Sequence, residues 1–159
     1  MAFITFTVIP DAGTQGVQLL YRRDEYSFYA EHRPTGRGVS IAVNDLELWF
    51  DDEGLVLYVD GYCPYQGWQQ TPLSPPAYTS AGLVVVNPNP KSVQSGTGVG
   101  LNDLKTRWPV YVNQEGWVCI GDPADHGDQA VEFSPSSVAV LRGDQLVALW
   151  LHPVMAGGD

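Results

Sequence analysis

The sequence has few basic residues and long stretches with none. Its 159 residues include 8 Lys and Arg against 18 Asp and Glu, which gives a formal net charge of −10. No Lys or Arg lies between Gly38 and Pro90 or between Trp108 and Leu141. Proteins bind nucleic acid by placing clustered Lys and Arg against its phosphates. The composition therefore predicts that nucleic acid is not a partner.

Long apolar runs are also missing. A transmembrane helix needs about 20 consecutive apolar residues, and no run in the chain approaches that length. The first residues, MAFITFTVIPDAG, alternate like a strand and have no basic segment ahead of an apolar one, as a secretory signal would. We therefore expect a soluble cytoplasmic protein that has no membrane partner.

Cysteine is scarce, with Cys63 and Cys119 as its two members. Two cysteines are compatible with one disulfide or with two free thiols, and their spacing does not decide between these. In a chain without signs of secretion, such residues are more often small buried apolar side chains. We expect free thiols.

Known catalytic and cofactor motifs are absent. The glycines of 96–100 lack the spacing of a dinucleotide or phosphate loop, and no nucleophile elbow or HExxH pair occurs. The best cluster of potential metal ligands does not follow the alternation of a calcium loop, which leaves a bound cation there an open question; it consists of Asp122, Asp125, His126 and Asp128. We assign no catalytic, cofactor-binding or metal-binding residue, and the sequence favours a protein that is not an enzyme without deciding the question.

What the sequence does contain is short alternating segments separated by turn residues. It has 17 Gly and 12 Pro, and 44% of its residues are hydrophobic. This mixture is typical of β-structure. We predict a single domain over 1–159, with 156–159 as a frayed tail. The predicted fold is mainly antiparallel β, a sandwich or strongly curved sheet of roughly nine or ten short strands with at most one or two short helices.

The expected strands follow from this alternation, and one helical turn is expected at 101–105. The stretch 87–100 is interpreted as a mobile surface loop. The strands are predicted at 3–9, 17–23, 26–32, 39–43, 46–50, 55–59, 83–86, 108–112, 117–121, 130–133, 138–141 and 146–151.

The fold is expected to be organised around a hairpin with the turn Asp51-Asp52-Glu53-Gly54. Its glycine suits the positive φ of a three-residue hairpin with a bulge. That turn sets Phe50 opposite Val56 and Trp49 opposite Leu57. Both faces of the hairpin are apolar, which predicts a central hairpin covered on both sides. Four of its side chains should then be largely buried, those of Trp49, Phe50, Leu57 and Tyr58.

A second turn, Asn113-Gln114-Glu115-Gly116, repeats this design and aligns Glu115 with Glu53. We expect Gly54 and Gly116 both to have positive φ. The similarity is explained either by an internal duplication or by the same local chemistry arising twice.

The stretch 61–78 is rich in aromatic residues, and its Pro and Gly residues exclude a continuous helix or strand. Two interpretations of its Tyr62, Tyr65 and Trp68 remain open. The stretch folds back as a lid on the core, or it presents its rings to a ligand.

The leading functional hypothesis is a small acidic, non-catalytic protein that binds a basic protein partner, in the manner of an inhibitor or immunity protein. The alternative is a small-ligand or sugar-binding protein, or a hydrolase, that uses 61–78 and an acidic segment. A solvated surface that keeps the protein soluble also explains the acids. The candidate binding residues are Asp51, Asp52, Glu53, Glu115, Tyr62, Tyr65 and Trp68.

Overall fold

A computed structural model describes residues 4–10, 18–31, 39–86, 98–101 and 106–156. Within these ranges the chain is mainly β, as predicted. The one helix among them is a single 3-10 turn, η1, at Tyr65–Gly67. No helix of the described ranges is long and apolar enough to cross a membrane.

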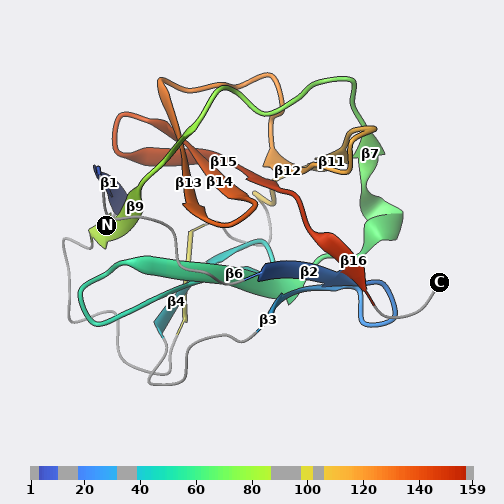
Figure 1. Cartoon of the computed structure of the whole chain (residues 1–159), viewed down its shortest axis with the longest axis horizontal. Helices are drawn as coiled ribbons and strands as arrows, with labels where there is room; N and C mark the ends of the chain where they lie inside the picture. Colours follow the sequence, from blue (N-terminus) through green and yellow to red (C-terminus); the bar gives the residue numbers. More distant parts are fainter. Residues whose placement is uncertain (1–3, 11–17, 32–38, 87–97, 102–105, 157–159) are drawn as a thin grey trace.

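The strands form two seven-stranded sheets and a two-stranded ribbon (Figure 1). One sheet, here called the β6 sheet, has the order β10-β4-β5-β6-β3-β2-β16. In that order its strands are Gly98–Gly100, Val39–Val43, Leu46–Phe50, Val56–Tyr62, Ser27–Glu31, Gln18–Arg22 and Val154–Ala156.

The second sheet, here called the β15 sheet, has the order β7-β11-β12-β15-β14-β13-β8. In that order its strands are Gln69–Gln70, Val110–Val112, Val118–Gly121, Gln145–Leu151, Ser137–Arg142, Gln129–Ser134 and Thr79–Ser80. The ribbon joins β1, Thr5–Ile9, to β9, Gly82–Val86.

The two sheets pack as the layers of a sandwich, seen edge-on in Figure 1. Leu48 and Val56 of the β6 sheet and Val131 and Leu149 of the β15 sheet belong to one core cluster and are fully buried. The strands outnumber the predicted nine or ten, in part because loops add short edge strands. Four of these, β7, β8, β10 and β16, pair in parallel with a neighbour and are at most three residues long, too short to show an alternating pattern.

The predicted central hairpin is formed by β5 and β6, in the middle of the β6 sheet. Phe50 pairs with Val56, as predicted, but Trp49 pairs with Tyr58 and not with Leu57. The expected register is therefore wrong beyond the first pair, because a bulge at Leu57 adds one residue to β6.

The bulge keeps apolar residues on the inner face of the hairpin, where Val59 pairs with Leu48 and both are almost completely buried. On the outer face Tyr58 is buried, while Trp49 and Leu57 are half-buried. Among the described residues no further sheet covers the outer face. It has a small apolar cluster, beside which the indole N–H of Trp49 donates to Asp60 at 2.8 Å.

The two hairpin turns have the predicted backbone. Gly54 and Gly116 have φ of +89° and +90°. Each turn also begins with a side chain that accepts from the backbone, since Asp51 Oδ1 takes the N–H of Leu55 at 3.0 Å and Asn113 Oδ1 takes the N–H of Trp117 at 3.0 Å. The local chemistry of the two turns is therefore the same.

The predictions for the loop 87–100, the helical turn 101–105 and the C-terminal tail have different outcomes. Residues 98–100 form strand β10 beside β4, so the loop interpretation is wrong there. The predicted frayed tail begins at 156, but Ala156 is the last residue of strand β16, so the prediction is wrong there. The rest of the expected loop, most of the helical turn at 101–105 and residues 157–159 lie outside the described residues. Strand β16 is missing from the prediction, because its three residues are too short to show an alternating pattern. It follows β15 closely in the chain and joins the edge of the β6 sheet beside β2.

Candidate partner-binding surface

The β1–β9 ribbon closes one end of the sandwich and ties together a hairpin turn from each sheet. Phe6 and Val85 are paired residues of the ribbon. The N–H of Phe6 donates to the carbonyl of Asp144 at 2.9 Å, and the N–H of Val85 donates to the carbonyl of Gly54 at 2.8 Å. Figure 1 shows the ribbon between the ends of the β5–β6 and β14–β15 hairpins. The turns 51–54 and 142–145 therefore lie on opposite sides of one strand pair.

The glycine of the first turn makes this contact possible. A Cβ atom on Gly54 would lie 2.8 Å from the carbonyl oxygen of Val85, and the residue has a φ of +89°. Neither the conformation nor the close approach suits another residue. The glycine at position 54 therefore allows the turn 51–54 to lie directly against the ribbon.

Exposed carboxylates project from both turns. Asp52 and Glu53 are exposed, and no ion pair within the described part of the chain involves either of them. Asp144 is exposed on the other turn, where its carboxylate accepts from Gln145 at 3.3 Å. Three strand spacings separate Gly54 from Asp144, which at about 4.8 Å each places the turns about 15 Å apart. Carboxylates from two sheets thus share one end of the molecule.

Two further acids surround the second turn. Asp128 accepts from the N–H of Gly143 at 2.9 Å, and Asp125 forms an ion pair with Arg142. The hydrogen bonds from Arg142 lower the pKa of the Asp125 carboxyl. This part of the surface is here called the acidic end. Among the described residues it combines the guanidinium group of Arg142 with the carboxylates of Asp51, Asp52, Glu53, Asp125, Asp128 and Asp144.

The acids of 122–128 accept hydrogen bonds from nearby backbone N–H groups. Asp122 accepts from the N–H of Ala124 at 2.9 Å, so it stabilises a local turn as Asp125 and Asp128 do. In the part of the chain that the structure describes, no three His, Cys, Asp or Glu side chains are placed to hold a metal ion.

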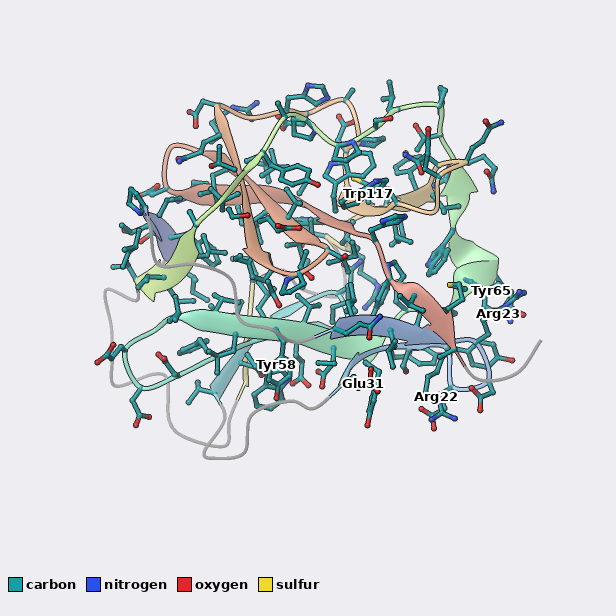
Figure 2. The ribbon with its side chains drawn as sticks, in the orientation of Figure 1. Arg22, Arg23, Glu31, Tyr58, Tyr65 and Trp117 are labelled. Atoms are coloured by element: carbon teal, nitrogen blue, oxygen red, sulfur yellow. The ribbon has the colours of Figure 1, made fainter. Side chains whose placement is uncertain are left out.

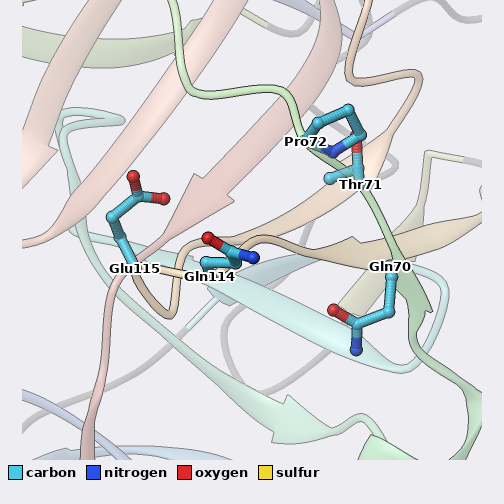
Figure 3. A pocket seen from close by; sticks show the side chains of 5 residues that line it. All are labelled: Gln70, Thr71, Pro72, Gln114 and Glu115. Atoms are coloured by element: carbon cyan, nitrogen blue, oxygen red, sulfur yellow. The ribbon is translucent and has the colours of Figure 1, made fainter.

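Glu115 lies apart from the acidic end. It is at the tip of the β11–β12 hairpin, where its carbonyl accepts from Nε2 of His152 at 2.9 Å. Figure 3 shows it across a shallow cleft of about 310 Å³. That cleft is lined by Gln70, Thr71, Pro72, Gln114 and Glu115. The structure does not bring Glu115 together with the turn 51–54.

Trp68 of the aromatic stretch lies on the core. Its ring centroid is 4.9 Å from that of Tyr21 and 6.1 Å from that of Phe28. Its indole N–H donates to the sulfur of Cys63 at 3.4 Å. For this residue the lid interpretation describes the structure.

The two predicted tyrosines are more accessible. Tyr62 is 50% exposed, and Tyr65 is half-buried beneath the guanidinium of Arg23, which lies 4.4 Å from the ring centroid. Figure 2 shows Arg23 beside Tyr65 next to η1. Tyr62 ends strand β6, which begins just after the turn 51–54 and spans about 20 Å. Tyr62 and the acids of the turn 51–54 therefore occupy opposite ends of the same hairpin.

The two cysteines are free and buried, as predicted. Burial raises the pKa of Cys63 to about 11 and that of Cys119 to about 12. Both thiols are protonated at neutral pH, and a thiol must ionise to act as a nucleophile.

Sequence reasoning missed Asp128 and Asp144 as members of the acidic end. Both lie next to Gly143, in a segment that the sequence indicates only as a hairpin turn. Comparisons of the chain with protein-family models, with curated proteins and with solved structures give no match.

Proposed function

We propose that this protein is a non-catalytic binding protein that uses its acidic end to bind a basic protein partner. One observation supports the proposal. The β1–β9 ribbon holds the turn of Asp52 and Glu53 and the turn of Asp144 on opposite sides of a single strand pair. A solvated acidic surface does not require acids from distant parts of the chain to gather at one end.

A basic group that binds between the two turns would interact with both. The Debye length is about 10 Å at about 0.1 M salt, and a point midway between turns about 15 Å apart lies within that length of each. The field of these carboxylates attracts a basic protein and increases its association rate, an effect that salt weakens.

The acidic end also has an apolar element. Val86 follows Val85, the ribbon residue that donates a hydrogen bond to Gly54, and its side chain is 42% exposed. Protein interfaces commonly combine an apolar centre with a polar rim. Val86 is one residue from the pair of Phe6 and Val85 that joins the two acidic turns, and it fits that arrangement on a small scale.

The first experiment is affinity capture from a native lysate on the immobilised protein, at low and at high salt. We expect a basic protein to be retained at low salt and released at high salt. The association rate of that partner is then measured for Glu53→Lys. We expect this variant to slow association several-fold at low salt and to have little effect at high salt.

Glu115→Lys is the matched control. Glu53 and Glu115 occupy the same position in two similar turns, each followed by a glycine with φ near +90°, and both are exposed. The two variants change the net charge equally, but only Glu53 lies at the acidic end. If both variants slow association to the same extent, overall charge explains the binding and the acidic end is not the binding surface.

A further inference from the structure

A second cleft lies at the other end of the β5–β6 hairpin. It has a volume of about 260 Å³ and opens between the aromatic stretch, the β4–β5 turn and the segment before β11. Ligand pockets for drug-sized molecules commonly have about 300 to 1,000 Å³, so this cleft suits a smaller ligand, of about one six-membered ring with its substituents. The side chains used below are Tyr62, Trp68, Gln69, Arg107 and Trp108, which all line it.

The position of Trp108 is built into the fold. The side chain of Asn44 donates to the carbonyl of Trp108 at 2.9 Å and accepts from its N–H at 2.9 Å. Asn44 has a φ of +54°, a conformation that asparagine tolerates better than most residues. The β4–β5 turn therefore holds the backbone of Trp108 at two points, 64 residues away in the chain.

The aromatic side chains of the cleft differ in how far they are already in contact with other parts of the protein. Trp68 is packed against the core on one side and its N–H is occupied by Cys63. Trp108 also packs against the core but stays half-buried, and none of the ring contacts or hydrogen bonds found in the described residues involves its side chain. Tyr62 is 50% exposed at the rim. The cleft thus offers aromatic surface and polar ring atoms to a bound molecule.

The polar groups favour a neutral ligand with hydroxyl groups. Arg107 donates to Asp45 at 2.7 Å, so the charged groups beside the cleft balance one another. Arg107 still has N–H groups to donate, and Asp45 has a second carboxylate oxygen to accept. Gln69 is exposed and adds an amide that can do both. Hydroxyl groups donate and accept, so they match this mixture better than an anion or a cation does.

We propose that this cleft binds a neutral pyranose ring. The ring would place its apolar C–H face against Trp108 and direct its hydroxyl groups toward Gln69 and Arg107. The proposal concerns binding and not hydrolysis, because Asp45 is engaged by Arg107. It is independent of the acidic end, which lies at the other end of strand β6.

The test is a titration of the ¹⁵N-labelled protein with four methyl pyranosides, those of glucose, galactose, mannose and N-acetylglucosamine. We expect at least one of them to bind in the millimolar range and to shift the indole signal of Trp108 and the amide signal of Gln69. Trp108→Ala should weaken that binding at least about tenfold, the effect expected for losing a stacked ring. Gln69→Ala, an exposed substitution that leaves the core intact, should weaken it several-fold.

Two controls distinguish a sugar site from an apolar cleft. Trp117→Ala removes another half-buried indole outside the cleft and should leave the affinity unchanged. Cyclohexanol has a ring of the same size with one hydroxyl group and should bind more weakly than the best glycoside. The proposal is overturned if no glycoside shifts the Trp108 signal, if Gln69→Ala and Trp108→Ala both leave binding unchanged, or if cyclohexanol binds equally well.

Discussion

Replacing Gly54 by alanine tests whether the ribbon fixes the acidic turn. Gly116 provides a matched comparison, because its φ of +90° is nearly the same as the +89° of Gly54. The surroundings differ. A Cβ on Gly54 would lie 2.8 Å from the carbonyl oxygen of Val85, whereas a Cβ on Gly116 would lie 3.7 Å from the ring of His152, an ordinary contact.

The difference in magnitude follows from these contacts. A non-glycine residue in a left-handed conformation costs about 1 to 2 kcal/mol, which applies to both positions. At Gly54 the added Cβ must also push the ribbon away, which weakens the 2.8 Å hydrogen bond from Val85. A hydrogen bond contributes about 0.5 to 1.5 kcal/mol, and the displaced contacts add to this. We expect a loss of about 1 to 2 kcal/mol for Gly116→Ala and about 2 to 4 kcal/mol for Gly54→Ala.

Urea unfolding followed by tryptophan fluorescence measures both losses, with unchanged slopes required for a valid comparison. A valine at either position should destabilise the protein further, since β-branched residues are excluded from this conformation. Equal losses for the two alanine variants would refute the reasoning, because they would show that the ribbon does not press against the turn 51–54.

Three further predictions concern the core and the thiols. Phe50→Ala should lower the free energy of unfolding by about 3 to 5 kcal/mol in urea, since Phe50 packs on the inner face of the central hairpin, and a loss below about 1 kcal/mol would place it outside the core. Burial raises the pKa of Cys119 from 9.0 to about 12, so the unfolded chain releases this proton first and stability should fall as pH rises from 9 to 12. Cys119→Ala should reduce the slope of that fall by up to about 1.4 kcal/mol per pH unit, and an unchanged slope would contradict the assignment. Neither Cys63 nor Cys119 should react with a thiol reagent at neutral pH until the protein unfolds, and rapid reaction of the folded protein would contradict their burial.

Local features of the hairpins are predictable from sequence, and the register is not. A turn is determined by a few adjacent residues, and Gly54 and Gly116 have the positive φ that their turns require. The bulge at Leu57 is different, because an apolar residue suits either face of β6. Packing of the hairpin against the second sheet decides which face of β6 each apolar residue takes. The sequence of the hairpin alone carries no information about that packing.

The candidate surface is harder to predict for the same reason. Asp52 and Asp144 lie far apart in the chain, and each stands in a turn that looks ordinary by itself. They come together because β1 pairs with β9. Strand β1 forms a hydrogen bond with the turn of the β15 sheet, and strand β9 forms one with the turn of the β6 sheet. The cleft has a similar origin, since Asn44 holds Trp108 across 64 residues. Non-local pairing of this kind leaves no pattern in the local sequence.

The most direct test of the proposed function is the association rate of the captured basic partner with Asp144→Lys. Asp144 lies in a hairpin turn of the β15 sheet, and Glu53 lies in a hairpin turn of the β6 sheet. The structure places both turns at the acidic end. If the two turns form one binding surface, Asp144→Lys should slow association at low salt by a factor similar to that of Glu53→Lys, with both effects lost at high salt. An association rate for Asp144→Lys no lower than that of the control Glu115→Lys would contradict the proposal that the two turns act together.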